Sequence, residues 1–322
     1  MKKLLALILI IATMLLLVSC KPKDNVEIRV AYLNGPTGIG MAKMIHDHTD
    51  TESQYTFTKY IAPDKVVTDL NAGNIDIACL STEVAAKFYN NGYDYQVLAI
   101  NCLNSICLMV NDNVSVSSIY DLEGQTICTS KQGTPKLILE ALLEAYGVNA
   151  TITDSYDGET VINTPDQLPQ VITQNKADII LAPVHVAYNT LANPNTKHRI
   201  TLNIDELWDA KFDTPIAMGC VVARTEFINN HPDAVKSFLD EYAQSIAYMT
   251  DSQNVDTAAE YIVDSTILPN LIPAKNTLAE LSEGIKFVSG STMKTTLINI
   301  YNVFGLATVG GKLPDDNFYY GE

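Results

Sequence analysis

The fold is decided by a segment that occurs twice, first as Gly73-Asn74-Ile75-Asp76-Ile77-Ala78-Cys79-Leu80-Ser81-Thr82 and again as Asn175-Lys176-Ala177-Asp178-Ile179-Ile180-Leu181-Ala182-Pro183-Val184. Each copy follows an amphipathic helical pattern and begins with a residue that can close a helix in the left-handed conformation. An Asp then opens a short buried strand, and a residue that can start a helix follows it. The repeat predicts two units of the same local architecture.

A second pair of segments repeats at a similar spacing, Leu33-Asn34-Gly35-Pro36-Thr37-Gly38 and Ser130-Lys131-Gln132-Gly133-Thr134-Pro135. Both are typical of a strand, a tight turn and the start of a helix. Around them, short apolar runs alternate with helical patterns, which indicates βα units. We therefore expect an α/β fold with two lobes, each a mainly parallel sheet flanked by helices.

The hydrophobic pattern also predicts individual elements. Expected strands cover residues 27–33, 54–60, 76–80, 126–129, 178–181 and 216–223. Expected helices cover residues 39–48, 63–71, 82–90, 135–146, 165–174 and 232–249. Residues 95–110 form one long apolar stretch.

Length and charge limit the class of protein. The chain has 322 residues, which is long for one hydrophobic core and suits two lobes. Its formal net charge of −16 repels phosphate backbones, and 8% aromatic residues with one Trp provide few stacking surfaces. Nucleic acid is therefore not an expected partner.

The N-terminal residues are typical of an export signal. Lys2 and Lys3 precede an apolar run over residues 4–18, too short for a stable membrane span. The run ends in Leu17-Val18-Ser19-Cys20, which resembles a bacterial lipobox. We expect residues 1–19 to be a lipoprotein signal peptide, Cys20 to be lipidated, and residues 20–25 to be a tether to the membrane. The alternative is a plain signal peptide with an incidental Cys.

The remaining cysteines resemble small buried hydrophobic residues because most lie inside apolar runs. They are Cys79, Cys102, Cys107, Cys128 and Cys220. A disulfide between Cys102 and Cys107 is an open alternative. No CxxC motif occurs, so neither a zinc ribbon nor a thioredoxin-like site is supported, and no metal or cofactor is expected.

Turns from strand to helix are the candidate ligand site. They place backbone N–H groups and helix N-termini at the carboxyl edge of a parallel sheet, where ligands of open α/β sheets bind. The candidate ligand-binding residues are Asn34, Gly35, Pro36, Thr37, Ser81, Thr82, Glu83, Lys131, Gln132, Gly133, Thr134 and His185. The alternative is that the Thr and Ser hydroxyls only cap their helices.

Motifs of common enzyme classes are missing from the sequence. Gly35-Pro36-Thr37-Gly38-Ile39-Gly40 invites a nucleotide-binding interpretation, but Lys43 stands where the dinucleotide fingerprint needs its last glycine. The sequence contains no GK[ST], HExxH or GxSxG motif. We expect no catalytic residues.

Several segments occur in the order found in one family of transport proteins: the Cys20 lipobox, residues 35–38, the helix at 63–70 that leads to residues 73–78, the turn at 119–127, and Gly133-Thr134-Pro135. On these segments the chain resembles the substrate-binding lipoproteins of ABC importers, in the nitrate, sulfonate and thiamine-precursor group. One departure is that relatives often carry Pro-Glu-Pro where this chain has Pro183-Val184-His185.

The resemblance implies a two-lobed periplasmic-binding-protein fold of type II, in which the chain crosses between the lobes twice. We expect the crossings near Met109–Asp112 and Gly219–Val222. Lobe 1 then comprises residues 26–110 plus 221–322, and lobe 2 comprises residues 111–220.

The implied function is that of an extracytoplasmic, lipid-anchored and monomeric receptor that delivers a small polar or anionic organic molecule to an ABC permease and its ATPase. His185 would face the ligand and carry a charge near the ordinary histidine pKa of about 6.5, or have a structural role instead. Two other functions stay open. Some thiamine and menaquinone biosynthetic enzymes resemble the same fold, and a sensory or adhesive lipoprotein would share the anchor.

Overall fold

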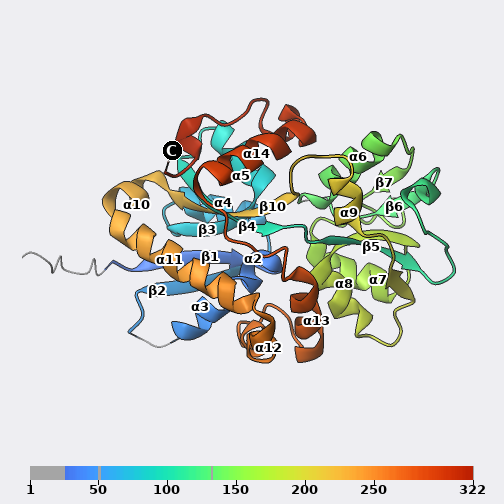
Figure 1. Ribbon diagram of the computed structural model, residues 1–322, viewed down its shortest axis with the longest axis horizontal. Coiled ribbons are helices and arrows are strands. Elements are labelled where there is room, and N and C mark those ends of the chain that lie inside the picture. Colours follow the sequence, from blue (N-terminus) through green and yellow to red (C-terminus); the bar gives the residue numbers. More distant parts are fainter. Residues whose placement is uncertain (1–25, 50–51, 132, 322) are drawn as a thin grey trace, which may run out of the picture.

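The computed structural model describes residues 26–49, 52–131 and 133–321, which form two lobes that each contain a five-stranded sheet (Figure 1). The first sheet has the order β2-β1-β3-β10-β4 and the second has the order β7-β6-β8-β5-β9. The strands of the first are β1 (Ile28–Leu33), β2 (Tyr55–Tyr60), β3 (Ile77–Ser81), β4 (Tyr95–Leu103) and β10 (Ala217–Arg224). The strands of the second are β5 (Ile106–Asn111), β6 (Thr126–Cys128), β7 (Thr151–Thr153), β8 (Ile179–Pro183) and β9 (His198–Ile200).

Each sheet is mixed, with one strand that opposes the others. In the first sheet β10 is antiparallel to β3 and β4, and in the second β5 is antiparallel to β8 and β9. Both are the strands that the chain forms directly after it changes lobe. The remaining strands of each sheet run in one direction, so the prediction of mainly parallel sheets is confirmed.

The chain changes sheet earlier than the sequence suggested. The stretch at 95–110 contains both β4 and β5, and Asn104 between them has a positive φ of 41°. The predicted crossing at Met109–Asp112 is wrong because most of it lies inside β5, and the one at Gly219–Val222 is wrong because it lies inside β10. Both strands of the first crossing are buried, so their apolar runs join in the sequence.

Helices cover both sheets. Lobe 1 begins with α2 (Pro36–Ile39), α3 (Ala42–Asp47), α4 (Pro63–Asn71) and α5 (Thr82–Asn90). Lobe 2 contains α6 (Pro135–Tyr146), α7 (Leu168–Thr173), α8 (Val184–Leu191) and α9 (Ile204–Asp209). The C-terminal part forms α10 (Thr225–Asn230), α11 (Pro232–Met249), α12 (Val255–Asp264), α13 (Leu271–Leu281) and α14 (Gly290–Phe304).

Two predicted helices are interrupted. The helix expected at 39–48 is divided into α2 and α3, and the one expected at 165–174 begins as the 3-10 turn η2 (Pro165–Gln167) before α7. The predicted bounds of α4, α5, α6 and α11 are confirmed.

The first internal repeat is confirmed by the backbone. Gly73 and Asn175 have positive φ values of 73° and 51°, so each closes its helix in the left-handed region. Gly35 and Gly133 share φ values of 95° and 96°. Gly35 is the N-cap of α2, whereas Gly133 precedes Thr134, the N-cap of α6. The second pair of segments therefore shares a left-handed glycine, but at positions that differ by one residue.

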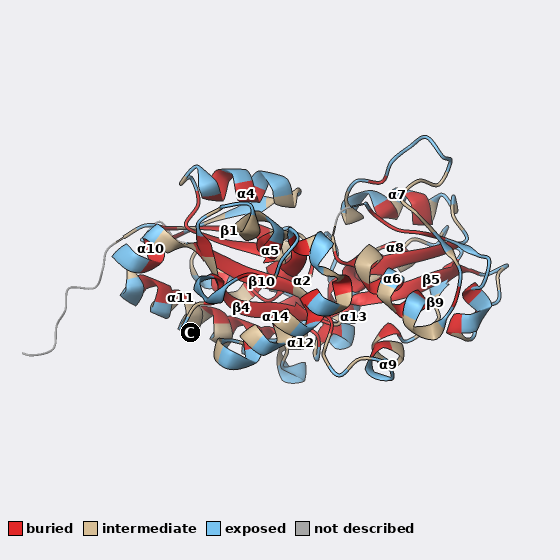
Figure 2. Ribbon diagram, turned by 90° about the horizontal axis from the view of Figure 1, so that it is seen from above, coloured by how far each residue is buried: buried red, intermediate tan, exposed pale blue. Residues whose placement is uncertain are grey.

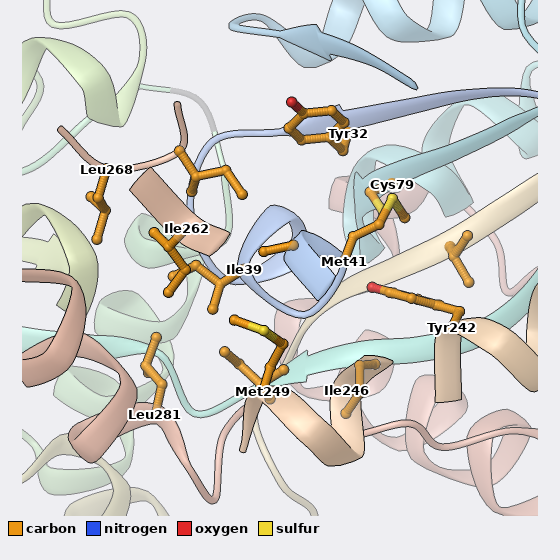
Figure 3. Close-up of a cluster of buried hydrophobic side chains, with 14 of the residues drawn as sticks. Tyr32, Ile39, Met41, Cys79, Tyr242, Ile246, Met249, Ile262, Leu268 and Leu281 are labelled. Carbon is orange, nitrogen blue, oxygen red and sulfur yellow. The ribbon is translucent and has the colours of Figure 1, made fainter. Parts of the chain in front are cut away.

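The buried side chains lie along the strands and the inward faces of the helices (Figure 2). Figure 3 shows how the turn after β1 is fixed: Ile39 lies near Met249 of α11, in a buried cluster that also contains Met41 and Ile246. A Cβ atom added to Gly40 would approach Ile246 Cγ1 to 3.0 Å, so close packing holds α2 in place. This positions the residues that precede α2.

The cysteines behave as the sequence predicts. Cys79, Cys102, Cys107, Cys128 and Cys220 are all buried and unpaired, so the alternative of a Cys102–Cys107 disulfide is wrong for this structure. Burial raises the pKa of the Cys79 and Cys102 thiols to about 12, which leaves both protonated at neutral pH.

Within the described ranges, no helix combines the length and the apolar composition that crossing a membrane requires. The predicted signal peptide, lipidated Cys20 and tether lie outside the described residues.

Candidate functional site

A cavity of about 130 Å³ lies between the lobes, where the turns after β1, β3, β6 and β8 meet. We call it the inner cavity. Its lining comprises Leu33, Asn34, Pro36, Thr37, Ile61, Pro63, Ser81, Cys102, Ser105, Gly133, Thr134, Pro135, Pro165, Asp166, Pro183, His185, Met218 and Gly219. The carboxyl ends of parallel strands in both sheets therefore converge on one partly open space.

Most predicted ligand residues are brought together here. Those that line the inner cavity are Asn34, Pro36, Thr37, Ser81, Gly133, Thr134 and His185. Thr82 is fully buried and donates a hydrogen bond to the Ala217 carbonyl at 2.7 Å, so its hydroxyl has a structural partner. Gln132 lies outside the described residues.

The helix-capping alternative is wrong for Ser81 and Thr134. Each occupies the N-cap position of its helix, yet neither side chain caps the helix. Ser81 instead donates to Glu83 Oε1 at 2.8 Å. Its hydroxyl thus links a residue of the inner cavity to a neighbouring carboxyl group.

The two lobes touch at Gly35. A Cβ atom added there would lie 2.6 Å from His185 Cε1 and 3.0 Å from its Nε2, so the imidazole packs directly on the glycine. Nearby, Asn34 Nδ2 donates to Asp166 Oδ1 at 3.2 Å. These contacts join lobe 1 to lobe 2 and close one side of the inner cavity.

His185 does not carry the charge that the sequence suggested. It is buried, its Nδ1 has no hydrogen-bond partner, and desolvation lowers its pKa to about 4 although Asp166 acts in the opposite direction. The imidazole is therefore neutral between pH 6 and 8, and the expected charge near pH 6.5 is wrong.

Glu83 and Lys131 line a second space rather than the inner cavity. This outer cavity, of about 370 Å³, shares Pro63 and Gly133 with the inner one. Its lining comprises Pro63, Asp64, Glu83, Val84, Lys87, Phe88, Lys131, Gly133, Lys136, Leu137 and Thr308. The predicted residues thus divide between two adjoining spaces.

Glu83 is a buried carboxyl group that lines the outer cavity and accepts a hydrogen bond from Ser81 of the inner cavity. It is 7% exposed, its Oε2 has no hydrogen-bond partner, and burial raises its pKa to about 7, with the Ser81 hydrogen bond opposing the shift. Neutral and charged forms of Glu83 are therefore both populated near neutral pH.

The inner cavity has little charge. Among the described residues that line it there is no Lys or Arg, and Asp166 is its carboxylate. Sequence reasoning missed several lining residues, including Cys102, Ser105, Asp166 and Met218. The polar pair Asn104-Ser105 inside the apolar stretch was the available signal for the first crossing. In the described part of the chain, no group of three His, Cys, Asp or Glu side chains could hold a metal ion.

Residues 29–255 match the protein family described as NMT1/THI5 like. The chain belongs to this family. Among curated proteins, none matches it in sequence.

Several solved structures have a similar fold. An ABC transporter protein from Parabacteroides distasonis is 18% identical, with a TM-score of 0.74 over 92% of this chain and 99% of that one. The aliphatic sulphonate binding protein SsuA from Escherichia coli is 15% identical, with a TM-score of 0.69 over 91% of both chains. The alkanesulfonate-binding protein SsuA from Xanthomonas axonopodis pv. citri, bound to MOPS, is 13% identical, with a TM-score of 0.68 over 92% of this chain and 96% of that one. At these identities the likeness shows that the chain has the two-lobed α/β fold of periplasmic binding proteins.

Proposed function

We propose that this NMT1/THI5-like protein is the extracytoplasmic solute-binding component of an ABC importer. It binds a small molecule between its lobes, performs no covalent chemistry and passes the molecule to a permease that an ATPase drives. Two of the similar structures are sulfonate-binding proteins by name, which supports the transport role without naming the solute.

The observation that carries the proposal is the inner cavity. Thr37 comes from lobe 1 and Thr134 from lobe 2, and both line the same partly open space. A ligand that contacts both lobes stabilises the closed arrangement because an open arrangement offers it fewer contacts. This is the behaviour that a permease needs in order to distinguish loaded from empty receptor.

The charge of the inner cavity narrows the kind of solute. Transfer of an ion into a space without an opposite charge is costly, and the described lining residues provide no cation. We infer that the part of the solute inside the inner cavity carries no negative charge, because Asp166 is the charged side chain of the described lining.

A thermal-shift screen of pyrimidines, sulfonates, nitrate and amino acids tests the proposal. A true ligand at 100 times its dissociation constant should stabilise the protein by about 2.7 kcal/mol. Thr37→Ala and Thr134→Ala should each weaken the same ligand by about 0.5–3 kcal/mol, whereas Thr292→Ala, at an exposed position on α14, should not. A ligand whose affinity changes in neither cavity variant would contradict the shared site.

A permease gene and an ATPase gene beside this gene would separate transport from a sensory or adhesive role.

Lipid anchoring is a separate part of the proposal. The segment Leu17-Val18-Ser19-Cys20 behind an apolar run supports acylation of Cys20. Cys20→Ala should abolish labelling with a fatty-acid analogue and block maturation of the precursor. Equal labelling of the wild type and the variant would contradict the lipid anchor.

We also propose that the mature protein is a monomer, which light scattering of the purified protein tests.

A further inference from the structure

The outer cavity carries a concentration of positive charge that is unusual for this chain. Lys87 reaches it from lobe 1, and Lys131 and Lys136 reach it from lobe 2. The chain as a whole has a formal net charge of −16. The outer cavity is a neighbour of the inner one, since Pro63 and Gly133 line both.

We propose that the outer cavity binds an anionic group of the solute, such as a phosphate or a carboxylate, while the remainder of the solute occupies the inner cavity. This inference rests on the proposed function, because it assigns the two ends of the same ligand. In this arrangement the lysines of the outer cavity recognise the charge of the solute, and the mainly apolar lining of the inner cavity recognises its shape.

The acidic residues of the outer cavity are compatible with an anion. Asp64 and Glu83 oppose the three lysines, and Lys136 Nζ also lies 3.8 Å from Glu140 Oε1. Glu83 is buried, and its unpartnered Oε2 can hold a proton. A Glu83 side chain protonated on Oε2 can donate a hydrogen bond to an oxygen of the anion, while Glu83 Oε1 accepts the hydrogen bond from the Ser81 hydroxyl. The helix α6 also begins at this cavity, and its first backbone N–H groups favour negative charge.

Lysines on both sides of the outer cavity give an anion a role in closure. Lys87 lies on α5, and Lys136 lies on the first turn of α6. An anion between them is attracted by both lobes at once, and this attraction is strongest when the lobes are together. The anionic group would thus stabilise the closed form as well as add affinity.

Matched pairs of probes test the inference by calorimetric titration at low and high salt. Each pair shares one ring and differs in an anionic group: benzyl alcohol with benzyl phosphate, and 3-phenylpropan-1-ol with 3-phenylpropanoate. The anionic member should bind at least about tenfold more tightly, and the difference should shrink as salt rises. The double variant Lys131→Gln/Lys136→Gln should remove most of the difference and leave the neutral member unchanged. Lys236→Gln, an exposed lysine on α11, is the matched control and should change neither.

The outcomes distinguish this inference from the proposed function. Neutral members that bind as tightly as anionic ones, or an anionic preference that survives in the double variant, would overturn the assignment of the outer cavity and leave the solute-binding role intact. If no member of any pair binds and the ligand screen also finds nothing, the solute-binding function itself fails.

Discussion

Lobe 1 and lobe 2 place a buried titratable side chain at the same point of the repeat. Glu83 is the second residue of α5, after β3, and His185 is the second residue of α8, after β8. Burial acts on both but in opposite directions, because it raises the pKa of the acid to about 7 and lowers that of the base to about 4. Each group is thereby moved toward its neutral form. Desolvation therefore favours the uncharged form of both Glu83 and His185, although one is an acid and the other a base.

The same comparison shows a difference at the start of each repeated strand. Asp76 is buried and accepts hydrogen bonds from Arg29 Nη2 at 2.7 Å and Arg224 Nη2 at 2.8 Å. Burial alone would raise the pKa of Asp76, but the two guanidinium groups hold it below its usual value. Asp178, its counterpart in lobe 2, is exposed. The repeat thus conveys the backbone path, while the ionic cluster belongs to lobe 1 alone.

Replacing each of the two aspartates by Ala should give the largest difference between the lobes. Asp76→Ala leaves Arg29 and Arg224 without their shared partner, so we expect the free energy of unfolding to fall by about 3 kcal/mol. Asp178→Ala should change it by less than about 0.5 kcal/mol because only an exposed carboxylate is lost. Urea unfolding monitored by circular dichroism gives both values. Equal losses for the two variants would mean that the buried Asp76 contributes no more to stability than the exposed Asp178.

The two turn glycines offer a second matched pair. Gly35→Ala and Gly133→Ala both force a side chain into a positive φ, but only at Gly35 does the new Cβ meet the other lobe, at His185. We expect Gly35→Ala to weaken ligand binding by about tenfold more than Gly133→Ala and to increase the radius of gyration of the loaded protein in small-angle X-ray scattering.

The clash itself can be tested by removing its partner. His185→Ala in the Gly35→Ala background should restore the compact form, since the imidazole is then absent. If the double variant stays as open as Gly35→Ala, backbone strain and not the contact between lobes is responsible.

The sequence was most informative where local geometry decides the structure. The left-handed residues Gly73 and Asn175 could be predicted because only a few residue types tolerate that conformation. The first crossing could not, since β4 and β5 are both buried and their apolar runs join across Asn104-Ser105. Asp166 was also missed, because its contact with Asn34 depends on how the lobes meet and not on any local pattern.

Glu83 should make the protein less stable at alkaline pH. Its pKa is about 7 in the folded protein and near 4.5 when unfolded, so the folded state binds the proton more tightly, and stability falls as pH rises through 7. Groups that interact with it come from several elements: Ser81, Lys87, Cys220 and Tyr301. Asp64 and Lys131 line the same cavity. Glu83→Gln should raise the melting temperature by several degrees at pH 8 and by little at pH 5. A rise of equal size at both pH values would show that titration of Glu83 is not the cause.

His185 should give the opposite and smallest effect, which completes the comparison. Its pKa of about 4 in the folded protein lies below the ordinary 6.5, so the stability that its neutral form contributes is present above pH 6.5 and is lost as pH falls toward 4. His185→Gln keeps a polar side chain that cannot titrate, and it should therefore lose less melting temperature than the wild type between pH 6 and 4. Because the imidazole is already neutral between pH 6 and 8, ligand affinity in that range should have the same pH dependence in His185→Gln as in the wild type. A wild-type affinity that tightens from pH 8 to 6, and a flat profile in His185→Gln, would mean that His185 takes up a proton when the ligand binds.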